Sequence, residues 1–388
     1  MSATRVLMVT GAYWPELSGG GLQCRTMIQA LRDHYQFEVL TTCTDRTLPA
    51  ASEVEGTRVT RMYVDLAQPM TKVVAVLSTL AFFRRHGSRF DVVHLHGFSQ
   101  KSVLIVMLAL CLRKRIMLTI HTADHDEAAG VRRRGWLAYW AYRQADLYIA
   151  ISSRIAHNYL VAGLPKTRLR LAPNGLDVAR FHPASPAERG AARAGLGNLS
   201  ADLYWILFVG FFSREKGPDL LFDAWLRMHA DAPPSGLLFV GATDSEYQEV
   251  DRTLAAEIAA KAEQLGVSSR VRFTGPLAAV EQAYHAADIF VMPSTREAFG
   301  MVLVEAMASA LPVVASDIKG VTDEIVTDGH TGVLVPPGDP DALAAALRGL
   351  LVNSSGARSM GTHAREAAVS SYGIDVARQR WADAYEAL

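Results

Sequence analysis

The feature that most constrains the fold is an alternation of short apolar, β-branched runs with longer stretches of helical pattern, which occurs twice along the 388 residues. Such runs are typical of buried strands, and their alternation with helices predicts a parallel sheet covered on both faces. In the first half the runs are RVLMVT, FEVLTT, DVVHLH, RIMLTI and DLYIAI; in the second they are YWILFVG, GLLFVG, RVRFTG, DIFVMP, LPVVAS and TGVLVP. We therefore predict an α/β chain with two Rossmann-like, doubly wound domains.

The boundary between the two sets of strands is marked by the turn dipeptide Asn174-Gly175, which lies between Pro173 and Pro183. Asn-Gly and nearby prolines are turn and loop signals, so this stretch is the predicted linker, with an ordinary loop as the alternative. Segments 217–230 and 245–265 are of helix length in the second half. In open parallel sheets ligands bind beyond the carboxyl ends of the strands, so we expect two such domains to face each other across a cleft.

The bulk composition is that of a globular protein, with 50% hydrophobic and 20% charged residues. The cysteines Cys24, Cys43 and Cys111 are scattered and without metal-ligand spacing, which predicts free thiols in a reducing compartment. The N-terminal stretch MSATRVLMVTGAYWPE has no small-residue cleavage site, so it predicts a first strand rather than a signal peptide. We therefore expect a cytoplasmic location.

A net charge of zero conceals an asymmetry between the two halves. Residues 1–175 hold 22 Lys and Arg against 12 Asp and Glu, whereas the remainder holds 17 against 27. A basic half of this kind predicts an anionic partner. The basic segment 113–115 and the segment 132–143, which mixes arginines with Trp and Tyr, are typical of a membrane interface. Buried helices with solvated basic ends are the alternative.

Three glycines follow the first predicted strand. Gly19, Gly20 and Gly21 precede the helical pattern that starts at Leu22, and glycines let backbone amides approach an anion at a helix N-terminus. The stretch is neither a GxGxxG nor a phosphate-loop motif, so the nicotinamide and ATP classes lose support. A flexible turn without function is the alternative.

Two cations follow the first strand of the second half. VGFFSREKGPD supplies Arg214 and Lys216 on a strand-to-helix loop, where cations can neutralise a diphosphate as negative charge develops on it. A solvated charge run beside Glu215 is the alternative.

Two carboxylates frame the segment REAFGMVLVEAM at 296–307. Glu297 follows a predicted strand, and the pattern of 300–309 predicts an apolar helix that carries Glu305 in its second turn. The amides near Phe299-Gly300-Met301 are then a helix N-terminus that favours negative charge. Both acids could accept hydrogen bonds from a polyol, whereas a helix-start carboxylate and an interhelical hydrogen-bond partner are the structural alternatives.

Histidines gather at two predicted strand ends in the first half. His121 is the best placed of them for hydrogen bonding to a ligand, with a structural role as the alternative, while His94 and His96 lack a third ligand at zinc spacing. The pair Asp124 and Asp126 forms an Asp-x-Asp, but one such pair is expected by chance in this composition. We therefore predict no metal site.

With these stretches in view, the whole chain resembles the retaining glycosyltransferases of family 4, whose two Rossmann-like domains form the GT-B fold. The resemblance rests on the glycine loop and on DVVHLHG, LTIHT, APNGLD, FVGFFSREKG, VRFTG, MPSTREAFGMVLVEAMASALPVVAS and GHTGVLVPPGD. It implies that 1–175 with 374–388 is the acceptor-binding domain and that 176–373 binds a nucleoside-diphosphate sugar. The nucleotide sugar would be a substrate, and no cofactor is implied.

The resemblance also implies residue roles in the second domain. Lys216, with Arg214, would neutralise the diphosphate; Glu297 would hold the donor sugar and Glu305 the ribose. Phe299 lies beside Gly300 and Met301, whose amides would approach the phosphate and the sugar.

In the first domain, Gly19 and Gly20 would border the phosphates, and His121 would contact the donor sugar. The sequence departs from the family pattern at Phe211, where family members commonly have Arg. Arg214, three residues later, would have to supply the missing guanidinium group.

The implied activity is metal-independent transfer of a hexosyl or N-acetylhexosaminyl group to an acceptor hydroxyl with retention of anomeric configuration. The acceptor implied is a glycan or a lipid-linked molecule of cell-surface polysaccharide or glycolipid synthesis, used by a protein that lies peripherally on the inner face of the plasma membrane; no nucleic acid is expected. A nucleotide-sugar epimerase of similar fold and a non-catalytic sugar-binding protein remain alternatives.

Overall fold

The computed structural model describes residues 4–16, 18–65, 67–243 and 250–388 and divides into two compact units. The first unit is Met1–Gly175 with Ile374–Leu388, and the second is Leu176–Gly373. The first residues of the helix predicted at 245–265 lie outside the described residues, and the helix that follows them spans Leu254–Gln264.

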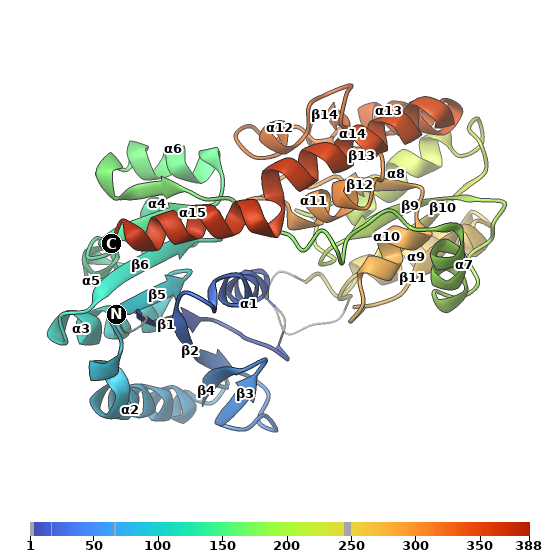
Figure 1. Cartoon of the computed structure of the whole chain (residues 1–388). Helices are drawn as coiled ribbons and strands as arrows, with labels where there is room; N and C mark the ends of the chain where they lie inside the picture. Colours follow the sequence, from blue (N-terminus) through green and yellow to red (C-terminus); the bar gives the residue numbers. More distant parts are fainter. Residues whose placement is uncertain (1–3, 17, 66, 244–249) are drawn as a thin grey trace. The chain divides into compact units, whose positions relative to one another are not determined.

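The first unit is built on an eight-stranded sheet with the order β3-β4-β2-β1-β5-β6-β7-β8 (Figure 1). All neighbouring strands are parallel except β3 and β4, which form an antiparallel pair. The strands are β1 Arg5–Thr10, β2 Gln36–Cys43, β3 Ala51–Val54, β4 Thr57–Tyr63, β5 Val92–His96, β6 Arg115–Ile120, β7 Leu147–Ala150 and β8 Leu169–Leu171.

Helices cover both faces of this sheet. They are α1 Gly19–Leu31, α2 Pro69–His86, α3 Gln100–Cys111, α4 Ala128–Arg133, α5 Trp136–Tyr142, α6 Ser153–Val161 and α15 Ile374–Glu386, with 3-10 turns η1 Gly87–Arg89 and η2 Lys166–Arg168. The strand order reverses direction at β1, and right-handed crossovers then place α1 on one face and α2, α3 and α5 on the other. The C-terminal helix α15 packs beside α1, where Trp381 and Tyr385 are buried with Cys24 and Met27.

The second unit has a six-stranded, wholly parallel sheet with the order β11-β10-β9-β12-β13-β14. Its strands are β9 Tyr204–Val209, β10 Ser235–Val240, β11 Val271–Phe273, β12 Ile289–Met292, β13 Val313–Ser316 and β14 Val333–Val335. The strand order reverses between β9 and β12, so the loops after these two neighbouring strands meet at the switch point where doubly wound sheets bind ligands.

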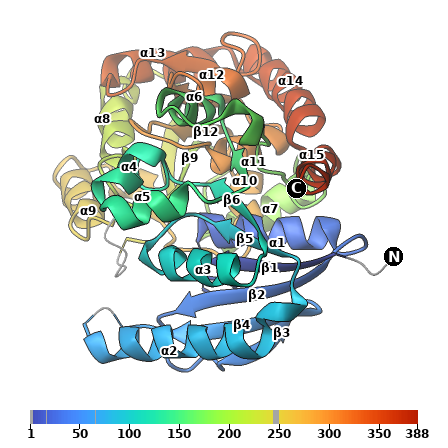
Figure 2. The same cartoon turned by 90° about the vertical axis from the view of Figure 1, so that its left-hand side faces the viewer.

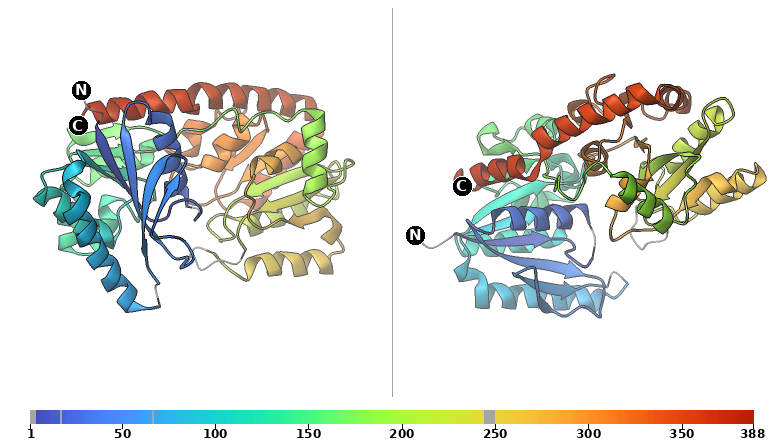
Figure 3. Two further views of the ribbon diagram at one scale, coloured as in Figure 1. Left: turned by 60° about the horizontal axis from the view of Figure 1, so that its bottom comes forward. Right: turned by 45° about the vertical axis from the view of Figure 1, so that its right-hand side comes forward.

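The helices of the second unit lie on both sides of its sheet, as two further directions of view show (Figure 3). They are α7 Pro186–Gly195, α8 Pro218–Met228, α9 Leu254–Gln264, α10 Glu281–Ala286, α11 Met301–Ala308, α12 Thr322–Ile325, α13 Pro340–Val352 and α14 Ser354–Tyr372, with the 3-10 turn η3 Ser268–Arg270. The core joins Trp225 of α8 and Leu347 of α13 to Ile206, Phe208 and Phe239 of the sheet.

The predicted fold class is confirmed, because each of the eleven predicted runs contains a strand and each half is a doubly wound sheet. The sequence pattern did not predict β3, β4 and β8. Strands β3 and β4 form a short hairpin whose alternating pattern includes charged residues, and β8 has three residues at the edge of the sheet. Neither pattern is the continuous apolar run of a central parallel strand.

Candidate active site

The switch point of the second sheet brings a lysine and a glutamate together that are 81 residues apart in the chain. The Nζ atom of Lys216 lies 2.7 Å from Oε2 of Glu297, and the glutamate side chain is the more buried of the two. Lys216 is on the loop after β9 and Glu297 on the loop after β12, the neighbouring strand. The topology therefore places a cation and a carboxylate where a ligand of this sheet would bind.

Gly217 fixes the loop that carries Lys216. It has a left-handed conformation with φ of +72°, and a Cβ atom there would lie 2.8 Å from the carbonyl oxygen of Pro293. Only glycine allows both this backbone geometry and the close approach to the segment after β12. The amide of Lys216 donates to the carbonyl of Ser213 at 3.0 Å, so the lysine backbone is fixed on both sides.

The start of α11 is fixed in a similar way. Gly300 has φ of +99° and is the N-cap of the helix, which begins at Met301. Phe299 is buried and packs edge to face on Tyr372 at 5.6 Å between ring centroids, which anchors the segment. The Glu297 carboxylate accepts a hydrogen bond from the amide of Ala298 at 3.1 Å as well as from Lys216. The carboxylate is therefore oriented from two directions.

Glu305 lies one turn further along α11. Its carboxylate accepts a hydrogen bond from the hydroxyl of Tyr284 at 2.7 Å, and burial raises the pKa of Glu305. A half-buried acceptor of this kind, oriented by a tyrosine on α10, has the chemistry to bind the hydroxyl groups of a polyol.

Arg214 is placed apart from this pair. Its guanidinium lies 3.0 Å from Asp219 and 3.0 Å from Glu257, with Asp251 at 3.8 Å, and its side chain is 60% exposed. Asp219 in particular raises the pKa of Arg214. Lys216 therefore pairs with Glu297, whereas Arg214 pairs with carboxylates on α8, on α9 and on the segment before α9.

In the first unit, the three glycines form the first turn of α1. Ser18 is the N-cap, and its hydroxyl accepts a hydrogen bond from the amide of Gly21 at 3.0 Å. A Cβ atom on Gly21 would lie 2.3 Å from the carbonyl oxygen of Ala12, so glycine is required there. A Cβ atom on Gly20 would meet the ring of His121 at 3.7 Å, whereas one on Gly19 would meet nothing within 4 Å. The glycine turn therefore borders His121.

His121 is held by a second histidine. Its Nε2 atom lies 3.0 Å from Nδ1 of His96, and the two rings stack at 5.2 Å between centroids with 18° between their planes. Burial lowers the pKa of His121 to about 4 and holds the pKa of His96 well below its ordinary value. At neutral pH both rings are therefore uncharged, and His121 can act as a hydrogen-bonding group rather than as a cation.

Asp126 organises the loop after β6. It accepts hydrogen bonds from the amides of Phe98 at 2.9 Å and Thr122 at 3.0 Å, so its carboxylate ties the loops after β5 and β6 together. Across residues 4–16, 18–65, 67–243 and 250–388, no group of three or more His, Cys, Asp or Glu has the arrangement of a metal site. The Asp-x-Asp at Asp124 and Asp126 thus has a structural explanation in Asp126.

His94 belongs to the core of the first unit. Its two ring nitrogens lie 2.7 Å from the hydroxyl of Tyr385 and 2.7 Å from that of Thr119. Burial lowers its pKa to about 3. The residue links the sheet to α15.

The sequence pattern did not single out Lys101, which lies at the carboxyl ends of β1 and β2. Its Nζ atom donates hydrogen bonds to the carbonyl of Thr10 at 2.6 Å and to the hydroxyl of Thr42 at 3.0 Å, and burial lowers its pKa to about 8. A lysine in the first turn of an otherwise apolar helix after a buried strand is the signal that could have identified it.

Two Rossmann-like units with this strand order define the class: the chain has the architecture of the GT-B glycosyltransferases. Among solved structures, Anabaena Alr3699/HepE, crystallised in complex with UDP and glucose, matches with a TM-score of 0.81 at 23% identity over 99% of this chain and 100% of that chain. At this identity the likeness shows the fold.

The particular family follows from the sequence matches. Residues 17–180 match Glycosyltransferase Family 4, and residues 204–353 match Glycosyl transferases group 1. A D-inositol 3-phosphate glycosyltransferase of Corynebacterium urealyticum is 30% identical over 322 residues, 78% of this chain and 73% of that protein. Another of that name from Geodermatophilus obscurus is 39% identical over 206 residues, 50% of this chain and 44% of that protein. The chain belongs to the family 4 glycosyltransferases.

Proposed function

We propose that this glycosyltransferase moves a hexosyl or N-acetylhexosaminyl group from a nucleoside-diphosphate sugar to an acceptor hydroxyl, with retention of anomeric configuration and without a metal ion. The observation that carries the proposal is the Lys216–Glu297 pair at the switch point of the second sheet. A lysine beside a carboxylate can bind a diphosphate and a sugar hydroxyl at adjacent positions.

In this proposal the second unit, 176–373, binds the donor. Lys216 neutralises the diphosphate, assisted by Arg214, and Glu297 holds the sugar. The amides at Gly300 and Met301, positioned by the buried Phe299, approach the phosphate and the sugar.

Glu305 accepts hydrogen bonds from the ribose hydroxyls. It is suited to this role because Tyr284 already orients one of its oxygens and because its burial strengthens a hydrogen bond to a neutral hydroxyl.

The first unit, 1–175 with 374–388, contributes the acceptor side. Gly19 and Gly20 border the phosphates, and His121 donates or accepts a hydrogen bond at the donor sugar. The low pKa of His121 supports this role, because a neutral ring adds no positive charge beside an oxocarbenium-like carbon.

When configuration is retained in a single step, without a covalent intermediate on the protein, the leaving group and the nucleophile share one face of the sugar. The bond from the anomeric carbon to the diphosphate oxygen breaks as the bond to the acceptor oxygen forms, and the acceptor proton passes to the leaving diphosphate. NMR of the product glycoside tests this step: we expect the anomeric configuration of the donor, and an inverted product would overturn it.

The acceptor proposed is a lipid-linked or growing glycan in cell-surface polysaccharide or glycolipid synthesis, at the cytoplasmic face of the plasma membrane. The excess of positive charge in residues 1–175 supports an anionic acceptor or surface. The two relatives are named for D-inositol 3-phosphate, a molecule that bears a phosphate, which also agrees with this charge.

A donor screen tests the proposal as a whole. The protein is incubated with a panel of nucleotide sugars and a lipid extract, and products are measured by mass spectrometry, with Lys216→Ala as the inactive control. Release of nucleoside diphosphate with a glycosylated lipid is the expected result. A changed sugar without transfer would indicate an epimerase, and neither product would indicate a sugar-binding protein.

A further inference from the structure

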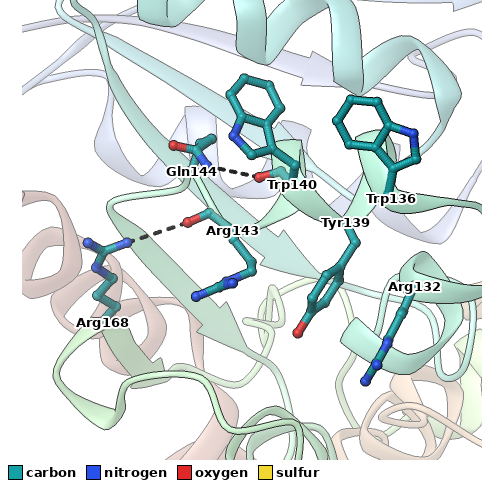
Figure 4. Close-up of a pocket in the computed structure, with 7 residues that line it drawn as sticks. All are labelled: Arg132, Trp136, Tyr139, Trp140, Arg143, Gln144 and Arg168. Atoms are coloured by element: carbon teal, nitrogen blue, oxygen red, sulfur yellow. Dashed lines mark hydrogen bonds between the residues drawn. The ribbon is translucent and has the colours of Figure 1, made fainter.

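A pocket of about 690 Å³ lies in the first unit, between α5 and η2 (Figure 4). It is lined by Arg132, Trp136, Tyr139, Trp140, Arg143, Gln144 and Arg168. The guanidinium of Arg168 donates to the carbonyls of Arg143 at 3.5 Å and Ala145 at 3.3 Å, just before β7 begins. The pocket is therefore at the amino ends of the strands, whereas Gly20 and His121 lie at their carboxyl ends.

The charged side chains that line this pocket are all positive. Arg132 and Arg143 lie over the ring of Tyr139, at 5.9 and 6.0 Å from its centroid, and none of the lining residues is acidic. In the part of the chain that the structure describes, no ion pair involves Arg132, Arg143 or Arg168. Three guanidinium groups line one hollow, and a guanidinium supplies the paired N–H donors that bind a phosphate.

The rim of the pocket is aromatic and open to solvent. Trp136 is 80% exposed, and Trp140 and Leu137 are exposed beside it. Figure 4 shows the two indoles projecting side by side from α5, with Tyr139 and Arg143 pointing away from them. Tryptophans next to arginines are typical of protein surfaces that contact the headgroups of a bilayer.

A second exposed apolar surface lies on α2. Met70, Val73, Val74, Leu77 and Leu80 share one face of the helix, and all five are exposed, with Leu77 at 59%. The buried residues Phe82 and Phe83 face the core, so this outer stripe is an apolar surface that the fold itself does not use.

The two surfaces belong to one layer of helices. Helix α2 contacts α3, α3 contacts α5, and Figure 2 shows the three on the same side of the first unit. None of α2, α3, α4 and α5 contains an Asp or Glu, whereas α2 ends in Arg84 and Arg85. An apolar stripe bordered by cations, without carboxylates, is complementary to an anionic bilayer.

We propose that α2, α3 and α5 form a docking surface for an anionic phospholipid bilayer, in which the pocket of Arg132, Arg143 and Arg168 holds a lipid phosphate and the outer stripe of α2 enters the acyl boundary. This deepens the proposed function, because it rests on an acceptor at a membrane and names the surface that meets the lipid. Within the described ranges no helix is long and apolar enough to cross a bilayer.

The test measures binding to vesicles of phosphatidylcholine, with and without phosphatidylglycerol. The double variant Arg143→Gln/Arg168→Gln is compared with Arg32→Gln/Arg378→Gln, which removes the same charge from α15 and from the end of α1. We expect the pocket variant to bind anionic vesicles about 30-fold more weakly than the wild type, since each surface cation contributes roughly one factor of five or more. The control should change much less, and equal loss in both variants would contradict a specific pocket.

The apolar stripe is tested by Val74→Ser/Leu77→Ser, with Val352→Ser/Val369→Ser as the control on exposed positions of the second unit. Weaker vesicle binding by the first variant alone supports insertion. Unchanged binding, or sedimentation showing that the stripe is covered by a second copy of the chain, would overturn it.

Two further measurements separate a lipid phosphate from a free phosphate ester, and the docking surface from the proposed function. Tryptophan fluorescence is followed during titration with soluble glycerol phosphate, and binding of this headgroup without binding of vesicles would contradict the lipid source. Release of nucleoside diphosphate from the donor in vesicle-free buffer should be the same in all four variants. If the wild type releases no nucleoside diphosphate, the proposed function is contradicted. If the wild type releases nucleoside diphosphate but does not bind vesicles, only the proposed docking surface is contradicted.

Discussion

The two units build their candidate sites from different chemistry. In the second unit the site residues are charged and already paired, with Lys216 on Glu297 and Glu305 on Tyr284. In the first unit an uncharged His121 stacks on His96 beside a turn of glycines, and Lys101 donates hydrogen bonds to Thr10 and Thr42. In the proposed function this difference corresponds to a division of work, in which the second unit would bind the charged donor and the first would supply hydrogen bonds and space.

The largest expected effect is on Lys216, because it is the cation at the switch point. Lys216→Ala should lower kcat for donor hydrolysis about 100- to 1,000-fold, as expected when one group that stabilises a developing charge is lost. Lys261→Ala is the matched control, since Lys261 pairs with Asp223 on the outer helices of the same unit. Comparable losses in both variants would remove Lys216 from the site.

The two carboxylates of 296–307 should separate in a kinetic comparison. Glu305→Gln should raise KM for the donor about 10- to 100-fold with little change in kcat, because the variant would lose the charged hydrogen bond to the ribose that the proposed function assigns to Glu305. Glu297→Gln should instead lower kcat about 100-fold, since in the proposed function Glu297 holds the sugar that is transferred. The reverse pattern would refute both assignments.

Arg214 should matter less than Lys216. Because Asp219, Asp251 and Glu257 already share its charge, Arg214→Ala should reduce kcat/KM only about tenfold. Steady-state kinetics of the single variants measures the ranking. Full activity of Arg214→Ala would show that this arginine does not compensate for Phe211.

The units should also respond differently to acid. The folded-state pKa values of His121, about 4, and His94, about 3, lie below the ordinary value for histidine. The unfolded chain therefore binds more protons than the folded chain, and the first unit loses stability as pH falls from about 6.5 toward 4. With His96, about two to three protons are taken up by these histidines on unfolding between pH 5 and 4. The raised pKa of Glu305 acts with the opposite sign in the second unit, because stability there falls as pH rises through the values between its ordinary and folded pKa.

Hydrogen exchange of the strands in each unit, followed between pH 7 and 5, measures this contrast. His121→Gln should remove about one proton from the uptake of the first unit and leave the second unit unchanged. A first unit whose stability is independent of pH in this range would contradict the burial of the histidines.

The smallest expected effect is at the glycine turn. Gly20→Ala places a methyl group against the ring of His121 and should raise KM about threefold, which corresponds to less than 1 kcal/mol. Gly190→Ala is the control, because Gly190 lies in α7 of the second unit, outside the proposed site, and its added Cβ meets nothing within 4 Å. Equal kinetics of the two variants would show that the space beside His121 is not used.

The sequence predicted the two sheets well because central parallel strands are continuous apolar runs. Residue type and position after strands singled out Lys216 and Glu297 as candidates. The sequence could not show that they pair, since this depends on β9 and β12 being neighbours across 81 residues. The sequence also could not show that His121 is neutral, because this follows from its burial. Nor could it show that the apolar stripe of α2 is exposed to solvent, because this follows from the direction in which the helix packs.

The most direct test of the division between the units is calorimetric titration of nucleoside diphosphates into the wild type, Lys216→Ala and Lys261→Ala. We expect the wild type and Lys261→Ala to bind at least one nucleoside diphosphate alike, and Lys216→Ala to bind it at least about tenfold more weakly. Equal affinity of all three proteins for the diphosphate would contradict the central role of Lys216.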